Sequence, residues 1–213
     1  MKNVCFIHVA TVGKYQAIVN DIFVKLKKSG LLNELYRIYV NIAGDEMVVI
    51  PPEDKIKIFP EKCDLGMYEL STLNLVKQYS DLKDANILYI HTKGVTSFNN
   101  PCIEEWRDYM FYFNILKYKT AIKQLEACDA VGVDLVDTPV KHFSGNIWWS
   151  KTSHIKTLPR VSDLPVVLSE RHKCEFWICS KTAGTYKSLH NSNIDVYSRH
   201  LTRYPKENYE DNN

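Results

Sequence analysis

The chain has 213 residues, of which 45% are hydrophobic and 24% are charged, and its formal net charge is +2. A chain of this length can bury one substantial core, so a single domain is expected. A net charge near zero gives no broad positive surface for DNA or RNA, and we expect no nucleic-acid partner. The apolar runs are far shorter than the roughly 20 residues needed to cross a bilayer, so no membrane span is expected.

The six cysteines are scattered through a chain that is too long for a small disulfide scaffold, and none of them forms a CxxC pair. Free thiols are therefore expected, and a zinc site is not. The N-terminal residues lead directly into a strand-like segment, without the charged, apolar and small-residue regions of a secretory signal. These features predict a cytoplasmic protein.

The first half of the chain alternates between strand and helix patterns. Residues 3–10 (NVCFIHVA) form a continuous apolar run, typical of a buried strand, and residues 15–28 carry apolar side chains at helical spacing before Gly30. Residues 35–42 and 55–59 are predicted strands with prolines between them. A predicted helix at about 67–79 then leads to a short buried strand at 85–91.

The second half continues the alternation. Residues 103–127 have a wide apolar face and predict one long helix. Residues 130–136 and 143–149 are predicted strands on either side of a turn at Pro139, and a last helix is predicted at 170–181. Residues 205–213 are polar and lack a periodic apolar face, so we expect residues 1–204 to form the domain and 205–213 a tail or a linker.

Strands separated by helices predict the α/β class, with a Rossmann-like, mostly parallel central sheet flanked by helices in one compact domain. In such sheets, ligands bind at the carboxyl ends of the strands. Functional residues are therefore expected near the strand ends, and four places in the sequence offer suitable polar side chains.

The first place is the turn after residues 3–10, where Ala10, Thr11 and Val12 precede a helix that begins near Tyr15. Free backbone amides and a hydroxyl at a helix N-terminus can bind a nucleotide base or a phosphate. The turn has neither GxGxxG nor GxxxxGK[ST], so it is neither a dinucleotide site nor a P-loop. An ordinary strand-to-helix turn is the alternative.

The second place follows the strand at 85–91, where the sequence reads His91-Thr92-Lys93-Gly94. Lys93 is suited to neutralise a diphosphate leaving group, and His91 to bind a metal or a phosphate. The alternative is a lysine in a surface loop and a histidine bonded to the backbone.

The third place is the segment FSGNIWW at 143–149. Ser144 and Asn146 offer groups suited to sugar hydroxyls, and Gly145 permits close approach of the backbone to a ligand. Trp148 and Trp149 point to opposite faces of the predicted strand, so one of them, Trp149, is a candidate platform for a sugar. Two core tryptophans are the alternative.

The fourth place is the helix at 170–181, where Glu175 is a candidate general base for an acceptor hydroxyl. Asp134, at the end of an earlier strand, is the other candidate for this role. The alternative for Glu175 is a glutamate near a helix N-terminus that is favoured only by the helix dipole.

Over roughly residues 3–200, the chain resembles the GT-A glycosyltransferases, in which a Rossmann-like nucleotide-binding half is fused to an acceptor-binding half. The resemblance is carried by FIHVATVGKYQAIVNDIF, LVKQYSDLKDANILYIHTKG and HFSGNIWWSK. It implies a GT-A fold and a site in which Lys77 reaches the phosphates while the base pocket is lined by Ala10, Thr11, Val12 and Tyr15. The sequence looks most like the N-terminal domain of a large glycosyltransferase encoded by chlorella viruses, which implies a UDP-sugar donor and a role in capsid glycan assembly.

The resemblance also implies a divalent metal, Mn²⁺ or Mg²⁺. Where the family has a metal-binding DxD motif after the strand, this chain has His91-Thr92-Lys93. A divalent ion would then need His91, a distant aspartate such as Asp134, or His190 as a ligand. Metal-independent relatives use basic side chains instead, and Lys93 with Lys77 or Arg107 could do the same.

The functional hypothesis is transfer of a hexose or 6-deoxyhexose, of glucose or rhamnose type, from a UDP-sugar to a hydroxyl of a glycan acceptor. Whether the reaction inverts or retains the anomeric configuration stays open. Two other classes also stay open. A sugar nucleotidyltransferase would share the sheet but usually carries a glycine-rich basic loop after the first strand, and a non-catalytic module would bind a nucleotide or sugar without turnover.

Overall fold

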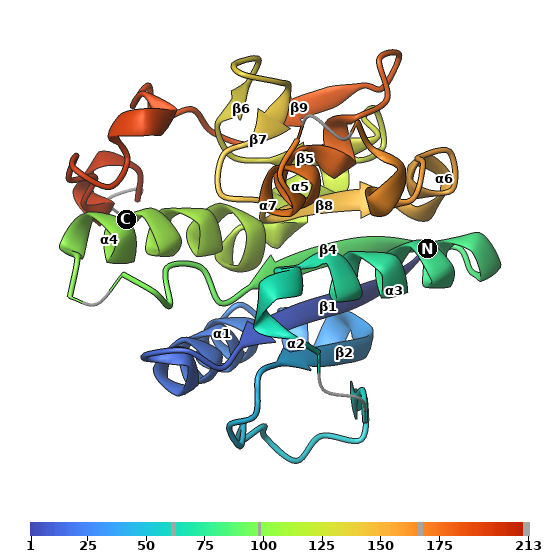
Figure 1. Cartoon of the computed structure of the whole chain (residues 1–213), viewed down its shortest axis with the longest axis horizontal. Coiled ribbons are helices and arrows are strands. Elements are labelled where there is room, and N and C mark those ends of the chain that lie inside the picture. Colours follow the sequence, from blue (N-terminus) through green and yellow to red (C-terminus); the bar gives the residue numbers. More distant parts are fainter. Residues whose placement is uncertain (61–62, 98, 166–167, 211–213) are drawn as a thin grey trace.

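The structure is a computed structural model that describes residues 1–60, 63–97, 99–165 and 168–210. Within these ranges the main sheet has seven strands, in the order β3-β2-β1-β4-β8-β5-β9 (Figure 1). These strands are β1 (Lys2–Ala10), β2 (Leu35–Ala43), β3 (Ile56–Ile58), β4 (Ala85–His91), β5 (Ala130–Gly132), β8 (Trp148–Lys151) and β9 (Tyr186–Ser188).

The sheet has a parallel half and a mixed half. β1 pairs in parallel with both β2 and β4, and β2 pairs in parallel with β3. β8 runs antiparallel to β4 and β5, and β9 is again parallel to β5. The chain is therefore an α/β domain with a mostly parallel sheet, compatible with a Rossmann-like fold, as the sequence predicts.

Helices cover both faces of the sheet (Figure 1). Cys5, Ile7 and Val9 of β1 pack in one hydrophobic cluster with α1 (Tyr15–Lys28) and α4 (Pro101–Phe111), whereas Val4 and Phe6 pack in a second cluster with α3 (Leu70–Leu82) and α7 (Glu170–Phe176). Because both of its faces are buried, β1 reads as a continuous apolar run.

The remaining elements are short. Two strands, β6 (Leu135–Val136) and β7 (His142–Phe143), form a separate antiparallel pair. The short α-helices are α2 (Leu31–Glu34), α5 (Tyr118–Gln124) and α6 (Thr152–Ile155). The other helical segments are η1 (Leu65–Met67), η2 (Tyr112–Leu116), η3 (Val161–Asp163), η4 (Trp177–Cys179), η5 (Val196–Ser198) and η6 (Lys206–Asn208). None of the helices in the described ranges has both the length and the apolar character needed to span a bilayer.

The single long helix predicted at 103–127 is wrong, because the structure divides it into α4, η2 and α5. η2 is a turn of π-helix in which the side-chain amide of Asn114 donates to the Met110 carbonyl at 3.0 Å. The Asn114 carbonyl itself accepts the indole N–H of Trp149 at 2.9 Å. A carbonyl engaged by a distant side chain is a local departure from the helical ladder, which an apolar periodicity does not reveal.

The predicted strands at 130–136 and 143–149 are also divided. Asp134 has a φ of 47° and separates β5 from β6, while Gly145 and Asn146 have φ values of 91° and 54° and separate β7 from β8. Positive φ angles are incompatible with a continuous strand, so the chain turns at these residues. β9 was not predicted at all.

The C-terminal segment differs from the expected polar tail. Residues 206–208 form η6, which packs on α4, and Tyr209 is buried against the rings of Tyr109 and Tyr112 (Figure 1). The domain therefore continues past residue 204 to at least Glu210. Residues 211–213, the rest of the predicted tail, lie outside the described residues.

Candidate functional site

A cleft of about 690 Å³ lies at the carboxyl ends of β1 and β4. The end of β1 provides Ala10 and Val12, and the end of β4 provides the segment from His91 to Gly94. Further walls come from the residue before α3, from α4 and α7, from the turn between β7 and β8, and from the C-terminal segment that follows β9. The side chains from these walls include Glu69, Trp106, Ser144, Arg171, Glu175, Tyr197 and Arg199.

Seven of the residues expected in a site from the sequence line this cleft. They come from segments far apart in the chain, and the fold brings them together at the carboxyl edge of the sheet. They are Ala10, Val12, His91, Lys93, Ser144, Gly145 and Glu175.

Three residues expected to bind the nucleotide are engaged elsewhere. The Thr11 hydroxyl donates to the Ala43 carbonyl at 3.1 Å, and the Tyr15 hydroxyl donates to the Met47 carbonyl at 3.0 Å. Lys77 lies on α3, where its ammonium is 2.5 Å from Asp81. None of the three is among the cleft residues, so we do not carry them into the site.

Asn146 and Trp149 are core residues. Both Trp148 and Trp149 are fully buried, and the Trp148 indole donates to the Asn146 side-chain oxygen at 3.0 Å. Trp149 donates to the Asn114 carbonyl, so neither ring has a face free to stack on a sugar. The alternative of two core tryptophans fits this arrangement, and the sugar platform does not.

Gly145 borders the cleft, but its lack of a side chain has a packing reason. A Cβ atom at this position would lie 2.3 Å from the Met110 sulfur, and the backbone φ of 91° also favours glycine. Gly145 therefore allows its backbone to lie close to α4. The sequence alone does not distinguish this packing role from close approach of the backbone to a ligand.

His91 is held by two acceptors. Its Nδ1 lies 2.9 Å from a carboxylate oxygen of Glu69, and its Nε2 lies 2.8 Å from the Gly145 carbonyl. Burial raises the pKa of Glu69, but the nearby His91, His8 and Lys93 outweigh it and lower that pKa to about 2. Both ring nitrogens of His91 are thus engaged by groups of the protein itself, so neither is turned toward a metal in the cleft.

His8 is the neighbour of His91 in the register of β1 and β4, and it also borders the cleft. Its Nδ1 lies 2.8 Å from the Thr72 hydroxyl. Burial is the main cause that lowers the pKa of His8 to about 4, so this ring is neutral at pH 7. The sequence signal for this residue is a histidine within an otherwise apolar strand, and it is not among the site residues expected above.

Lys93 is a half-buried cation in the cleft rather than a lysine in a surface loop. Its ammonium lies 4.4 Å from the centroid of the Trp106 ring, and no ion pair or hydrogen bond of this ammonium is found within the described ranges. Burial lowers the pKa of Lys93, and the charges of Glu175 and Glu69 oppose that shift. The side chain is therefore placed to meet an anion.

Glu175 faces the same cleft from α7 and pairs with Arg171 at 3.0 Å. It lies near the end of this helix, so stabilisation by the dipole at the helix N-terminus does not account for it. That explanation suits Glu170, which is the first residue of α7.

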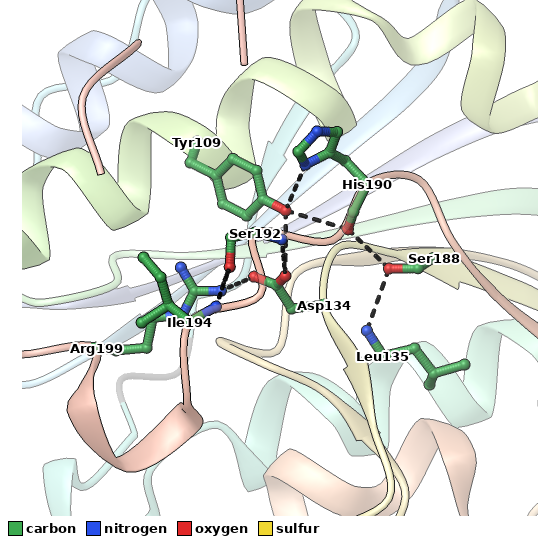
Figure 2. Close-up of polar contacts among 8 residues, drawn as sticks. All are labelled: Tyr109, Asp134, Leu135, Ser188, His190, Ser192, Ile194 and Arg199. Carbon is green, nitrogen blue, oxygen red and sulfur yellow. Dashed lines mark hydrogen bonds and ion pairs between the residues drawn. The ribbon is translucent and has the colours of Figure 1, made fainter. Parts of the chain in front are cut away.

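Asp134 does not line the cleft. It is buried, it accepts the backbone N–H of Ser192 at 2.7 Å, and it forms an ion pair with Arg199 (Figure 2). The Tyr109 hydroxyl lies 3.3 Å from the same carboxylate. A carboxylate enclosed in this way cannot reach an acceptor hydroxyl, so we do not retain Asp134 as a general base.

The three expected metal ligands do not converge. His190 lies beside Tyr109, with 3.2 Å between its Nδ1 and the tyrosine hydroxyl, and it borders a separate cavity of about 450 Å³. His91 and Asp134 are each engaged as described above. Among the described residues, no three histidine, cysteine or acidic side chains form a group that could hold a metal ion.

Other residues of the cleft are not expected from the sequence, among them Glu69, Trp106 and Arg199. Glu69 is the N-cap residue of α3, Trp106 lies on α4 and Arg199 lies in the C-terminal segment, so none of them follows a predicted strand. Only the tertiary fold brings them to the ends of β1 and β4.

Comparison with known families matches residues 8–189 to a domain of unknown function, DUF8361. The chain belongs to this family. A search of curated proteins finds no match to the chain.

Proposed function

We propose that this protein is a glycosyltransferase of the GT-A type that moves a hexose or 6-deoxyhexose from a UDP-sugar to a hydroxyl of a glycan acceptor. The observation that carries the proposal is Lys93, a cation without a carboxylate partner within the described ranges, in a cleft at the carboxyl ends of two parallel strands. This edge is where α/β sheets bind nucleotides. A sheet with a parallel half and a mixed half also agrees with the resemblance found in the sequence.

Ser144 is a candidate contact for the donor sugar. Ser144 lines the cleft, and its hydroxyl is buried and has no hydrogen-bond partner among the described residues. Because a buried hydroxyl without a partner is costly, a sugar hydroxyl in the cleft would stabilise it. The end of β1, at Ala10 and Val12, is left for the nucleotide.

The chemical step proposed for the site needs a base and a cation. The acceptor oxygen forms a bond to the anomeric carbon while the bond from that carbon to the diphosphate oxygen breaks, and UDP leaves with the electron pair. Glu175 takes the acceptor proton, as an inverting reaction requires. Lys93 stabilises the negative charge that develops on the leaving diphosphate.

A divalent metal is implied by the resemblance, but the candidate ligands do not fit it. His91 has both ring nitrogens engaged by Glu69 and the Gly145 carbonyl, Asp134 is enclosed by Arg199 and Ser192, and His190 borders a different cavity. No step of the proposed reaction therefore passes through a metal. A role in viral capsid glycan synthesis rests on the resemblance alone.

The test is calorimetric titration with UDP, GDP and CMP, followed by measurement of UDP release from UDP-glucose and UDP-rhamnose. We expect selective UDP binding. Lys93→Met should weaken UDP binding at least tenfold, whereas Lys77→Met removes an equal charge outside the cleft and should leave UDP affinity unchanged. If the wild type binds no nucleotide, the proposal is wrong.

Turnover separates an enzyme from a binding module. Glu175→Gln should lower kcat by about 10²–10⁴-fold, with UDP affinity nearly unchanged, because only the proton acceptor is lost. Glu170→Gln, on the same helix but away from the cleft, is the matched control. Tight UDP binding without UDP release from either donor would instead favour a non-catalytic module.

A further inference from the structure

A second cation reaches the cleft from the C-terminal segment. The side chain of Arg199 is 2% exposed, borders the cleft, and lies with its guanidinium carbon 5.6 Å from the ring centroids of both Trp106 and Tyr109. One of its nitrogens, Nη2, contacts both Asp134 and Ser192 (Figure 2). The guanidinium is thus fixed from one side.

The other two nitrogens of this guanidinium, Nε and Nη1, are buried and have no hydrogen-bond partner among the described residues. Guanidinium N–H groups are strong donors, and leaving them buried without an acceptor is costly. A fixed guanidinium with free donors matches the geometry of a phosphate or carboxylate oxygen pair. The free donors therefore indicate a ligand that is an anion.

The surroundings of Arg199 favour a position fixed before the ligand binds. Asp134 is itself held by the Ser192 N–H and cannot swing into the cleft. Lys93 and Arg199 both lie against the Trp106 ring, so the two cations flank one aromatic wall of the cleft. Together they offer the same ligand the ammonium of Lys93 and the planar guanidinium of Arg199.

We propose that Arg199 is the phosphate-binding residue of the cleft, with Nε and Nη1 donating to the diphosphate of the donor nucleotide and Asp134 acting as its positioning residue. This inference rests on the proposed function, which it deepens. Lys93 and Arg199 supply the positive charge that the diphosphate needs, and binding then requires no divalent ion.

The test compares the wild type with Arg199→Lys by calorimetric titration with UDP and with inorganic pyrophosphate, in EDTA and again with Mn²⁺. Lysine keeps a positive charge opposite Asp134 but removes the free donors. We expect both ligands to bind the wild type in EDTA and to bind the variant at least tenfold more weakly. An affinity for UDP within twofold of the wild type would overturn the inference, as would UDP binding that depends on Mn²⁺ and not on Arg199.

Folding is controlled in two ways. Asp134→Asn with Arg199→Gln removes both charges of the buried pair at once, so no uncompensated charge stays buried, and the same loss of affinity is expected. Arg203→Lys is the matched control, because Arg203 is exposed, pairs with Glu105 and does not border the cleft. Its UDP affinity should equal that of the wild type.

The two proposals fail in different ways. If the wild type binds UDP but the Arg199 variants bind it equally well, only the role of Arg199 is wrong. If the wild type binds pyrophosphate but no nucleotide, and the variants lose pyrophosphate, the anion site stands and the UDP-sugar transferase does not. If the wild type binds neither ligand, both proposals are wrong.

Discussion

At the carboxyl ends of β1 and β4, two histidines that are neighbours in register have different surroundings. The ring nitrogens of His91 lie against Glu69 and the Gly145 carbonyl. His8 faces the Thr72 hydroxyl, and burial lowers its pKa to about 4. His8 therefore adds no positive charge to the cleft at pH 7.

His8 makes stability depend on pH. Its pKa is about 4 in the folded chain and about 6.5 in the unfolded chain, so the unfolded chain binds more protons between these values. The contribution is present above pH 6.5 and is lost as the pH falls toward 4. For His8→Gln, we expect the drop in unfolding free energy from pH 7 to pH 4.5 to be smaller by about 2 kcal/mol.

Urea unfolding of the wild type and His8→Gln at pH 7 and pH 4.5 measures this difference. His200→Gln is the control, because His200 is exposed and its substitution should leave the pH dependence unchanged. Equal pH dependence in the wild type and in His8→Gln would show that burial of His8 does not couple to folding.

At the level of the elements, the sequence predicts those helices and strands whose apolar pattern follows from burial against the sheet or within it. The predicted bounds of α1 and β4 agree with the structure because each has an uninterrupted apolar face or run. The prediction from sequence fails where long-range contacts decide the backbone conformation. At η2, the Trp149 indole donates to the Asn114 carbonyl. At Asp134, the chain turns where the side chain pairs with Arg199.

The residues of the candidate site also fall into those that the sequence can place and those that it cannot. His91 is the last residue of the buried strand β4 and Lys93 follows shortly after it, so the topology of parallel sheets is enough to place them at the cleft. Arg199 and Glu69 lie in segments without a strand or a motif, and only packing brings them there. Thr11 and Tyr15 were expected in the site from their position in the chain, but their hydroxyls are bonded to backbone carbonyls of a neighbouring segment.

A substitution at Trp149 tests the hydrogen bond that joins β8 to η2. Trp149→Phe removes the indole N–H that the Asn114 carbonyl accepts and leaves a small void in the core, so we expect a loss of about 1–3 kcal/mol in unfolding free energy. The KM for the UDP-sugar should not change, because the ring does not reach the cleft. Urea unfolding and steady-state kinetics on the same sample measure both. A raised KM with unchanged stability would restore Trp149 as a sugar platform.

Over the whole molecule, the C-terminal segment runs from β9 to α4 and joins the rest of the domain at two places (Figure 1). Arg199 enters the cleft, and a few residues later Tyr204 and Tyr209 pack edge-on against Tyr109. The Tyr109 hydroxyl in turn lies beside Asp134, which holds Arg199 (Figure 2). The aromatic packing and the cationic side of the cleft are therefore parts of one contact network.

Tyr209→Ala tests whether this segment belongs to the folded domain. Tyr209 is 9% exposed and contacts the rings of Tyr109, Tyr112, Phe113 and Tyr204. Truncating a buried aromatic side chain in such a cluster is expected to lower the unfolding free energy by about 3 kcal/mol, measured by urea unfolding. Tyr36→Ala, at a half-exposed tyrosine on β2, should cost less than about 1 kcal/mol. If both substitutions cost the same small amount, residues 205–210 contribute little to stability, and the boundary at residue 204 predicted from the sequence would hold for stability despite the contacts.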